Sequence, residues 1–156
     1  MILYHGSYTV VDKPNISYSR DNVDFGKGFY TTPIKEQAEK WSKRFLRKKQ
    51  KAFISQYCFD EDNDLKVLKF DAYDENWLNF ILICRKGQDT SDYDVVIGGV
   101  ANDKVFNTVE LYFDGLIDKK EAIKRLIYEK PNMQVCFRTQ KALEKLKFEG
   151  SEEYVG

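Results

Sequence analysis

The chain has 156 residues, of which 42% are hydrophobic and 32% are charged, a balance typical of one folded domain spanning residues 1–156. Its 25 lysines and arginines equal its 25 aspartates and glutamates, so no net field attracts nucleic acid or an anionic membrane. No apolar run approaches the roughly 18 residues of a membrane-spanning helix. These numbers exclude a disordered or strongly basic chain and leave the activity to the motifs.

The cysteines and the N-terminus bear on the compartment. Cys58, Cys84 and Cys136 lie far apart, and each sits in an apolar run, which favours buried, reduced thiols over disulfides or a metal site. The first residues lack the basic and apolar regions of a secretory signal. We therefore expect a cytoplasmic bacterial protein without a metal.

The N-terminal stretch carries the chain's one histidine. Residues 2–8 predict a strand, in which alternation places His5 and Ser7 on the same face. A lone histidine is more often structural than catalytic, but Gly6 leaves the backbone open beside this imidazole. The polar residues 9–23 then predict a loop over the candidate site.

A glycine-containing stretch at 24–32 follows, and the rest of the chain is organised around it. Gly26 and Gly28 flank a lysine, so the backbone can turn tightly there or come close to a ligand. Aromatics and threonines come next, which favours a short, half-buried strand with Phe29 or Tyr30 as the wall of a pocket. The alternative is an ordinary hairpin corner with core aromatics.

Residues 34–49 have the period of an amphipathic helix, with Ile34, Ala38, Trp41 and Phe45 on one face. Two interpretations of the tryptophan stay open: a core residue, or a ring that stacks on a ligand. The far side of the helix is basic, which favours a solvated face over a surface for nucleic acid or an acidic partner. The basic residues are Lys43, Arg44, Arg47, Lys48, Lys49 and Lys51.

Strands and helices follow in the remaining chain. Residues 52–60 and 65–70 alternate like two strands joined by an acidic turn, and 93–97 is a continuous apolar strand, which predicts cover on both faces. Asp74 and Thr139 have the position of helix N-caps. The other predicted elements are a helix from Asp74 to Arg85, helical segments at 105–113 and 119–128, a strand at 132–137, a short helix from Thr139 to Leu146, and a polar tail.

Four motifs carry a resemblance to a known superfamily. Tyr-His-Gly-Ser at 4–7 and Gly-Lys-Gly-Phe-Tyr at 26–30 resemble the nicotinamide end of the ADP-ribosyltransferases, in the His-Tyr branch of diphtheria toxin and the poly(ADP-ribose) polymerases. The segments 92–103 and 131–139 are similar to an uncharacterised bacterial family of the same superfamily, often paired with an antitoxin-like partner. This resemblance implies an α+β fold: a split, mostly antiparallel sheet with surrounding helices and a central NAD groove.

The resemblance also implies how the chain would hold NAD. His5 would hydrogen-bond a ribose hydroxyl, the backbone at Gly6 would hold the nicotinamide carboxamide, and Tyr30 would stack on the nicotinamide ring. Trp41 follows Tyr30 by eleven residues, where the polymerase branch often has a second stacking aromatic. The implied NAD-binding residues are His5, Gly6, Ser7, Gly28, Tyr30 and Trp41.

One position departs from the pattern. In the resembled family a glutamate holds the ribose 2′-hydroxyl and stabilises the positive charge that develops as nicotinamide leaves. Here the motif places Gln134 at that point, so His5, Tyr30 and Gln134 form the implied catalytic set. A glutamine can accept the same hydrogen bond but lacks a charge attraction on the order of 4 kcal/mol, or roughly three decades in rate.

These motifs predict an NAD-dependent mono-ADP-ribosyltransferase, a glycosyltransferase with NAD as co-substrate. Because the resembled family is often paired with an antitoxin-like partner, the resemblance implies a toxin restrained by an antitoxin protein. The alternatives are a weak or inactive module that binds NAD or ADP-ribose, and a purely structural partner of another protein. The acceptor macromolecule stays open, with nucleic acid the less favoured choice, as does any role of Ala101-Asn102-Asp103.

Overall fold

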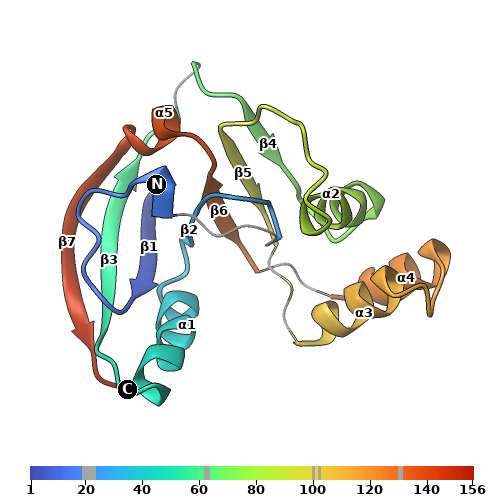
Figure 1. Cartoon of the computed structure of the whole chain (residues 1–156), viewed down its shortest axis with the longest axis horizontal. Coiled ribbons are helices and arrows are strands. Elements are labelled where there is room, and N and C mark those ends of the chain that lie inside the picture. The colour runs from blue at the N-terminus through green and yellow to red at the C-terminus, as the bar shows by residue number, and fades with distance from the viewer. Residues whose placement is uncertain (19–23, 62–63, 100, 102, 130–131) are drawn as a thin grey trace.

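The computed structural model describes residues 1–18, 24–61, 64–99, 101, 103–129 and 132–156, and shows a mixed α+β fold with two sheets (Figure 1). The three-stranded sheet has the order β1-β3-β7, and the four-stranded sheet has the order β2-β6-β5-β4. Neighbouring strands are antiparallel except β4 and β5, which are parallel. The strands are β1 (Ile2–Ser7), β2 (Phe29–Thr31), β3 (Ala52–Phe59), β4 (Val67–Lys69), β5 (Val95–Gly98), β6 (Gln134–Phe137) and β7 (Leu146–Tyr154).

The two sheets meet where β1 passes the end of β2. The N–H of Tyr4 donates to the Thr32 carbonyl at 2.8 Å, and the N–H of Thr32 donates to the Tyr4 carbonyl at 2.9 Å. This bridge is followed by divergence of the sheets, so β1 lies in one sheet and β2 in the other. The arrangement agrees with the prediction of a mostly antiparallel α+β fold.

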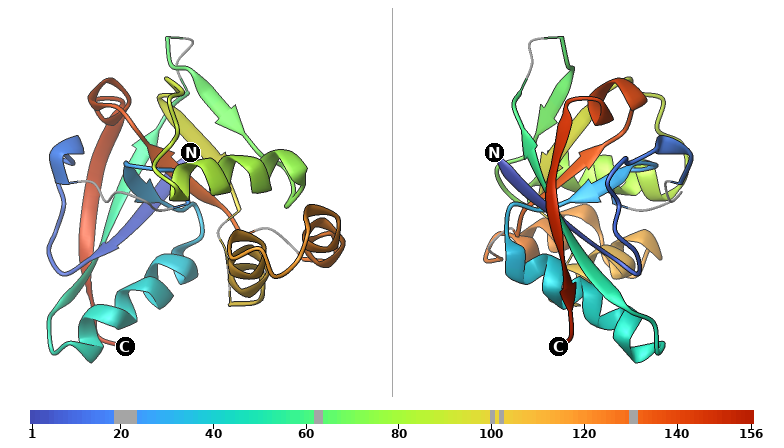
Figure 2. Two further views of the ribbon diagram at one scale, coloured as in Figure 1. Left: turned by 45° about the vertical axis from the view of Figure 1, so that its right-hand side comes forward. Right: turned by 90° about the vertical axis from the view of Figure 1, so that its left-hand side faces the viewer.

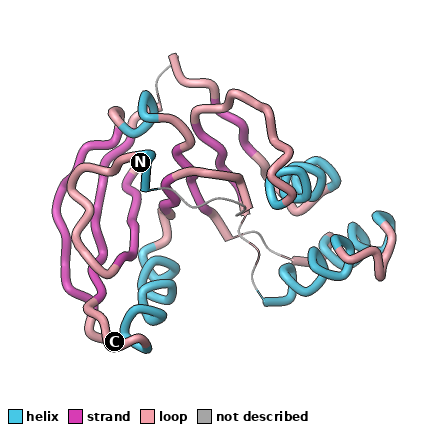
Figure 3. The backbone as a smooth tube through the Cα atoms, in the orientation of Figure 1, coloured by secondary structure: helices cyan, strands magenta, loops and turns pink. Residues whose placement is uncertain are grey.

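Helices lie around the two sheets rather than between their strands (Figure 3). The helix α1 packs on β1 and β3, whereas α3 and α4 pack on each other at the far side of the four-stranded sheet (Figure 2). The helical elements are the 3-10 turn η1 (Ile16–Tyr18), α1 (Lys35–Arg47), α2 (Glu75–Arg85), α3 (Asp103–Phe113), α4 (Lys119–Leu126) and α5 (Gln140–Leu143). Within the described ranges, no helix is long and apolar enough to cross a membrane.

Apolar side chains form one core on each face of the four-stranded sheet. The inter-sheet core joins the two sheets and α5 and consists of Leu3, Phe59, Leu65, Val95, Ile97, Val135, Phe137, Ala142 and Leu143. The helix-side core joins the opposite face to α2, α3 and α4 and consists of Phe25, Tyr73, Trp77, Leu78, Ile81, Val96, Val105, Val109, Ala122, Leu126 and Cys136. Strands β5 and β6 are therefore covered on both faces, as the apolar run at 93–97 predicts.

Two helix starts are confirmed in detail. The Asp74 carboxylate accepts the N–H of Trp77 at 2.9 Å, and the Thr139 hydroxyl accepts the N–H of Ala142 at 3.1 Å. Each side chain thus satisfies a backbone donor that has no partner within its helix. The helix predicted at 34–49 is also present, as α1.

Two predictions about strands are wrong. The segment at 65–70 does not pair with 52–60; its strand β4 instead pairs with β5 in the other sheet. The polar tail is in fact the nine-residue strand β7, which pairs with β3 on both sides of a bulge at Glu149, and α5 ends at Leu143, before this strand begins. β7 is an edge strand that is largely exposed, so it lacks the apolar alternation by which strands are recognised.

Candidate functional site

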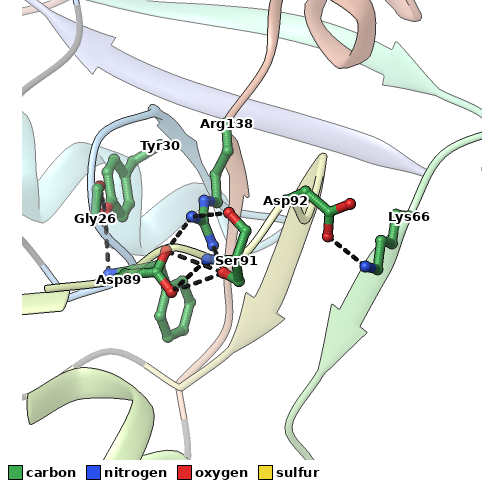
Figure 4. A network of polar contacts seen from close by, with 8 residues as sticks. Gly26, Tyr30, Lys66, Asp89, Ser91, Asp92 and Arg138 are labelled. Carbon is green, nitrogen blue, oxygen red and sulfur yellow. Dashed lines mark hydrogen bonds and ion pairs between the residues drawn. The ribbon is translucent and has the colours of Figure 1, made fainter. Parts of the chain in front are cut away.

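The turn before β2 is built by the glycine and the tyrosine of the second motif. Gly26 has a φ of 78°, a conformation that favours glycine. The Tyr30 hydroxyl donates to the Gly26 carbonyl and accepts the N–H of Phe25 at 3.0 Å (Figure 4). Burial raises the pKa of Tyr30 far above its usual value, so the hydroxyl stays neutral. Tyr30 therefore holds the turn in place, besides presenting a half-buried ring.

Gly28 lets the chain approach the neighbouring strand. A Cβ at this position would lie 2.4 Å from the Cys136 sulfur and 2.9 Å from the Phe137 carbonyl oxygen. Burial raises the pKa of the Cys136 thiol to about 12, so the packed sulfur is a neutral thiol. The close approach predicted for this glycine is present, but it is made to β6.

His5 is positioned by β2. Its Nδ1–H donates to the Tyr30 carbonyl at 2.7 Å, since a carbonyl oxygen can only accept. The imidazole stacks on the Phe29 ring with 4.2 Å between ring centroids. In the neutral ring this tautomer makes Nε2 an acceptor, the form that could take a hydrogen bond from a hydroxyl.

Gly6 and Trp41 come from β1 and α1. A Cβ on Gly6 would lie 2.2 Å from the Ser42 hydroxyl and 2.8 Å from the Ala38 carbonyl, so this glycine lets α1 press against β1. Of the two interpretations of Trp41, the core residue is wrong, because Trp41 is 52% exposed. The Arg44 guanidinium lies 4.5 Å from the Trp41 ring centroid, an arrangement that stabilises both on the surface. Ser7, at the end of β1, is buried.

Gln134 opens β6 opposite Gly98 of β5 and is 7% exposed. Its amide nitrogen Nε2 is buried and has no hydrogen-bond acceptor within reach among the described residues. A Cβ on Gly98 would meet the rings of Phe25 and Phe70 at 3.1 and 3.3 Å, so the neighbourhood is apolar and crowded. An amide in such a place is costly unless something pairs with it.

Of the three implied catalytic residues, Tyr30 and Gln134 lie on the helix-side face of the four-stranded sheet, whereas His5 lies towards the inter-sheet core. Tyr30 packs against the helix-side core, and Gln134 shares that face because Cys136, two residues along β6, belongs to the same core. His5 stacks on Phe29, which packs against the inter-sheet core. Within the described residues, the hydrogen bond from His5 to the Tyr30 carbonyl thus connects the imidazole to the strand that carries Tyr30, which in turn pairs with the strand of Gln134.

The third and fourth motifs meet in space and hold each other. The Asp94 carboxylate accepts from the Thr139 hydroxyl at 2.7 Å and from the N–H of Lys66 at 2.8 Å, so it joins α5 and β4 to β5. The guanidinium of Arg138 pairs with Asp89 and donates to the Ser91 hydroxyl at 3.2 Å (Figure 4). These polar residues have a structural role that the motif spacing did not reveal.

A second ion cluster ties the glycine turn to the third motif. Asp24 pairs with Arg85 at 2.8 Å, and Arg85 also pairs with Glu110 of α3 at 2.6 Å. The other Asp24 oxygen accepts the N–H of Ala101 at 3.4 Å. The backbone of Ala101 therefore helps to fix the turn through Asp24. Asn102 of the same tripeptide lies outside the described residues.

A shallow groove of about 250 Å³ lies on the outer face of the three-stranded sheet. Its rim is polar, and its carboxylates are engaged: Glu149 accepts from the Gln56 amide, and Glu152 pairs with Lys35. The groove is lined by Tyr4, Lys35, Ile54, Gln56, Glu149, Gly150, Ser151 and Glu152. None of these residues was predicted as a site residue, and the carboxylates Glu149 and Glu152 on the rim already have partners within the chain.

Comparison with known proteins places the chain in one family. Neither the curated proteins nor the solved structures gave a match. A family model described as "Protein of unknown function (DUF3990)" matches residues 1–148, a range that contains all four motifs and every predicted site residue. The chain belongs to this family.

Proposed function

We propose that the chain is an NAD-dependent mono-ADP-ribosyltransferase with an ADP-ribosyltransferase-like split sheet. The observation that carries the proposal is the order of neighbouring strands. β1, which holds His5, bridges to the end of β2, which holds Tyr30, and β2 pairs with β6, which holds Gln134. Three residues that lie 25 and 104 positions apart in sequence thus stand on neighbouring strands. Tyr30 and Gln134 share one face, and the hydrogen bond from His5 to the Tyr30 carbonyl joins the imidazole to them from the other face.

Each residue has a defined task in this proposal. The exposed Trp41 and the half-buried Tyr30 supply aromatic surface for the nicotinamide ring. His5 Nε2 accepts a hydrogen bond from a ribose hydroxyl, because its Nδ1–H is committed to the Tyr30 carbonyl. NAD itself supplies the reactive bond between ribose and nicotinamide, and the transferred ADP-ribose passes to an acceptor.

The burial of Gln134 supports an alternative, a module that binds NAD or ADP-ribose without efficient transfer. No carboxylate stands at this position, so the positive charge that develops on the ribose would lack its nearest countercharge. Both candidate functions use the same implied NAD-binding residues, and they differ only in turnover. The toxin role, the antitoxin partner, the acceptor macromolecule and the cytoplasmic location rest on the resemblance and composition alone.

Binding of NAD is tested by melting. Millimolar NAD at a hundredfold excess over its dissociation constant should raise Tm by about 5 to 10 °C, because a ligand that binds only the folded state stabilises it by about 2.7 kcal/mol. Trp41→Ala should reduce the shift, since this exposed ring can be removed without opening the core. Tyr128→Ala, which removes an exposed ring beyond α4, is the matched control and should keep the full shift. An unchanged Tm of the parent protein would count against both candidate functions.

Transfer is tested separately with labelled NAD and a cell lysate, followed by measurement of label on protein, nucleic acid and small molecules. Gln134→Glu restores the missing carboxylate and should raise NAD cleavage, by up to roughly three decades if the full charge attraction is regained. A parent protein that binds NAD but transfers none, with no gain from Gln134→Glu, would favour the binding module.

A further inference from the structure

The buried amide of Gln134 is an exception among the polar side chains around it. The Thr31 hydroxyl donates to the Val135 carbonyl at 2.9 Å, and the Thr32 hydroxyl donates to the Met133 carbonyl at 2.8 Å. Within the described residues, Gln134 Nε2 is the buried side-chain nitrogen or oxygen that finds no partner in the protein. Folded proteins rarely leave a buried donor in this state, so its presence calls for a reason.

The surroundings of this amide restrict what could pair with it. The position opposite is Gly98, and the nearest rings belong to Phe25 and Phe70. The two guanidinium groups described on the helix side of the sheet are committed, Arg85 to Asp24 and Glu110, and Arg138 to Asp89. An anion brought to Gln134 would therefore lose its hydration without gaining a free arginine among these residues. A neutral oxygen has much less hydration to lose, and one hydrogen bond from the amide can replace it.

We propose that Gln134 Nε2 is a recognition donor for a neutral oxygen of the ligand, a carbonyl or hydroxyl oxygen that enters beside Tyr30 at the start of β6. The amide thus acts as a donor, although the glutamate of the resembled superfamily can only accept when it is charged. The inference rests on the proposed function for the identity of the ligand as NAD. Its new content is the atom that makes the contact and the direction of the hydrogen bond.

An unpaired donor has a cost in the protein without ligand, and that cost can be measured without NAD. Gln134→Leu keeps the approximate size of the side chain and removes the donor, so it should raise Tm by roughly 2 to 6 °C. Thr31→Val is the matched control, because it removes an equally buried hydroxyl whose hydrogen bond is made. This control should lower Tm, since it leaves the Val135 carbonyl without that donor.

The ligand contact has its own measurement, the side-chain amide resonances of Gln134 in a ¹H–¹⁵N spectrum, identified by their absence in Gln134→Leu. Addition of millimolar NAD should move these resonances downfield, and Gln134→Leu should weaken NAD binding at least tenfold. A fall in Tm for Gln134→Leu comparable to that of Thr31→Val would overturn the inference, because it would show that the amide already has a partner.

The two proposals fail in different ways. If NAD raises Tm of the parent protein but neither shifts the Gln134 resonances nor loses affinity in Gln134→Leu, the inference is wrong and the NAD site stands. If Gln134→Leu gains stability but NAD binds neither protein, the NAD site is wrong and the unpaired donor stands.

Discussion

Strands β6 and β7 differ in how they are held. All four residues of β6 are buried between two cores, and the arginine that follows it, Arg138, is paired with Asp89 where both side chains are almost covered. β7 is an exposed edge strand, and its ion pairs, such as Glu152 with Lys35, lie in solvent. The same chemical interaction thus has a different weight in the two sheets, because water screens one pair and is largely excluded from the other.

The largest effect is expected at the Asp89–Arg138 pair. Asp89→Asn would leave the Arg138 guanidinium without its countercharge, where the two side chains are 13% and 11% exposed. Removal of one partner of a buried pair costs about 3 to 5 kcal/mol, and the remaining exposure places this case near 3 kcal/mol. Tm should fall by roughly 6 to 12 °C in thermal melts.

The pH dependence of the same pair has a definite sign. Burial works to raise the pKa of Asp89, but hydrogen bonds from Ser91 and the charge of Arg138 outweigh it and hold the pKa below its ordinary value of 3.8. The stability from this carboxylate is therefore complete above about pH 4 and is lost as the pH falls through the lowered pKa. The difference in Tm between the parent protein and Asp89→Asn should therefore shrink as the pH falls below about 4. Asp92→Asn, at an exposed aspartate paired with Lys66, is the control, and an equal loss there would contradict the comparison.

The next effect is expected at Gly28. Gly28→Ala would push a methyl group to within 2.4 Å of the Cys136 sulfur and 2.9 Å of the Phe137 carbonyl, so β2 would have to move from β6. Overpacking of this kind costs about 1 to 3 kcal/mol, which urea unfolding can measure. Combination with Cys136→Ala should recover part of the loss, because the sulfur contact is relieved while the carbonyl contact remains. If the double variant loses more stability than the sum of the losses in the two single variants, the contact with the sulfur is not what destabilises Gly28→Ala.

The sequence predicted the helices and strands well where burial gives a continuous apolar run or where a capping residue marks the start of a helix. The continuous apolar run at 93–97 and the capping residues Asp74 and Thr139 are examples, since each follows from one neighbourhood of the chain. Strand pairing does not follow in this way. The partner of β4 is β5, and β7 carries no apolar alternation, so both depend on contacts between distant segments.

The candidate site shows the same limit. The sequence indicated that the backbone needs glycine at Gly26 and Gly28. It did not indicate that the close neighbour of Gly28 is Cys136. Nor could spacing show that His5 faces the inter-sheet core while Tyr30 faces the helix-side core, because this depends on how β1 joins β2. The unpaired amide of Gln134 required coordinates, since the motif gives a residue type without its surroundings.

The smallest effect is expected at the exposed pair on the edge strand. Glu152 and Lys35 lie 2.5 Å apart, but their side chains are 56% and 43% exposed. The carboxylate raises the pKa of Lys35 through its hydrogen bond, yet both groups stay fully hydrated when the pair is broken, so Glu152→Gln should leave Tm unchanged within the error of the measurement. High salt should likewise change the parent protein and Glu152→Gln alike, because the lost interaction was already screened. A loss of Tm comparable to that of Asp89→Asn would mean that this contact, beside the groove on the outer face, fixes β7 to α1, and that the edge strand is held as firmly as β6.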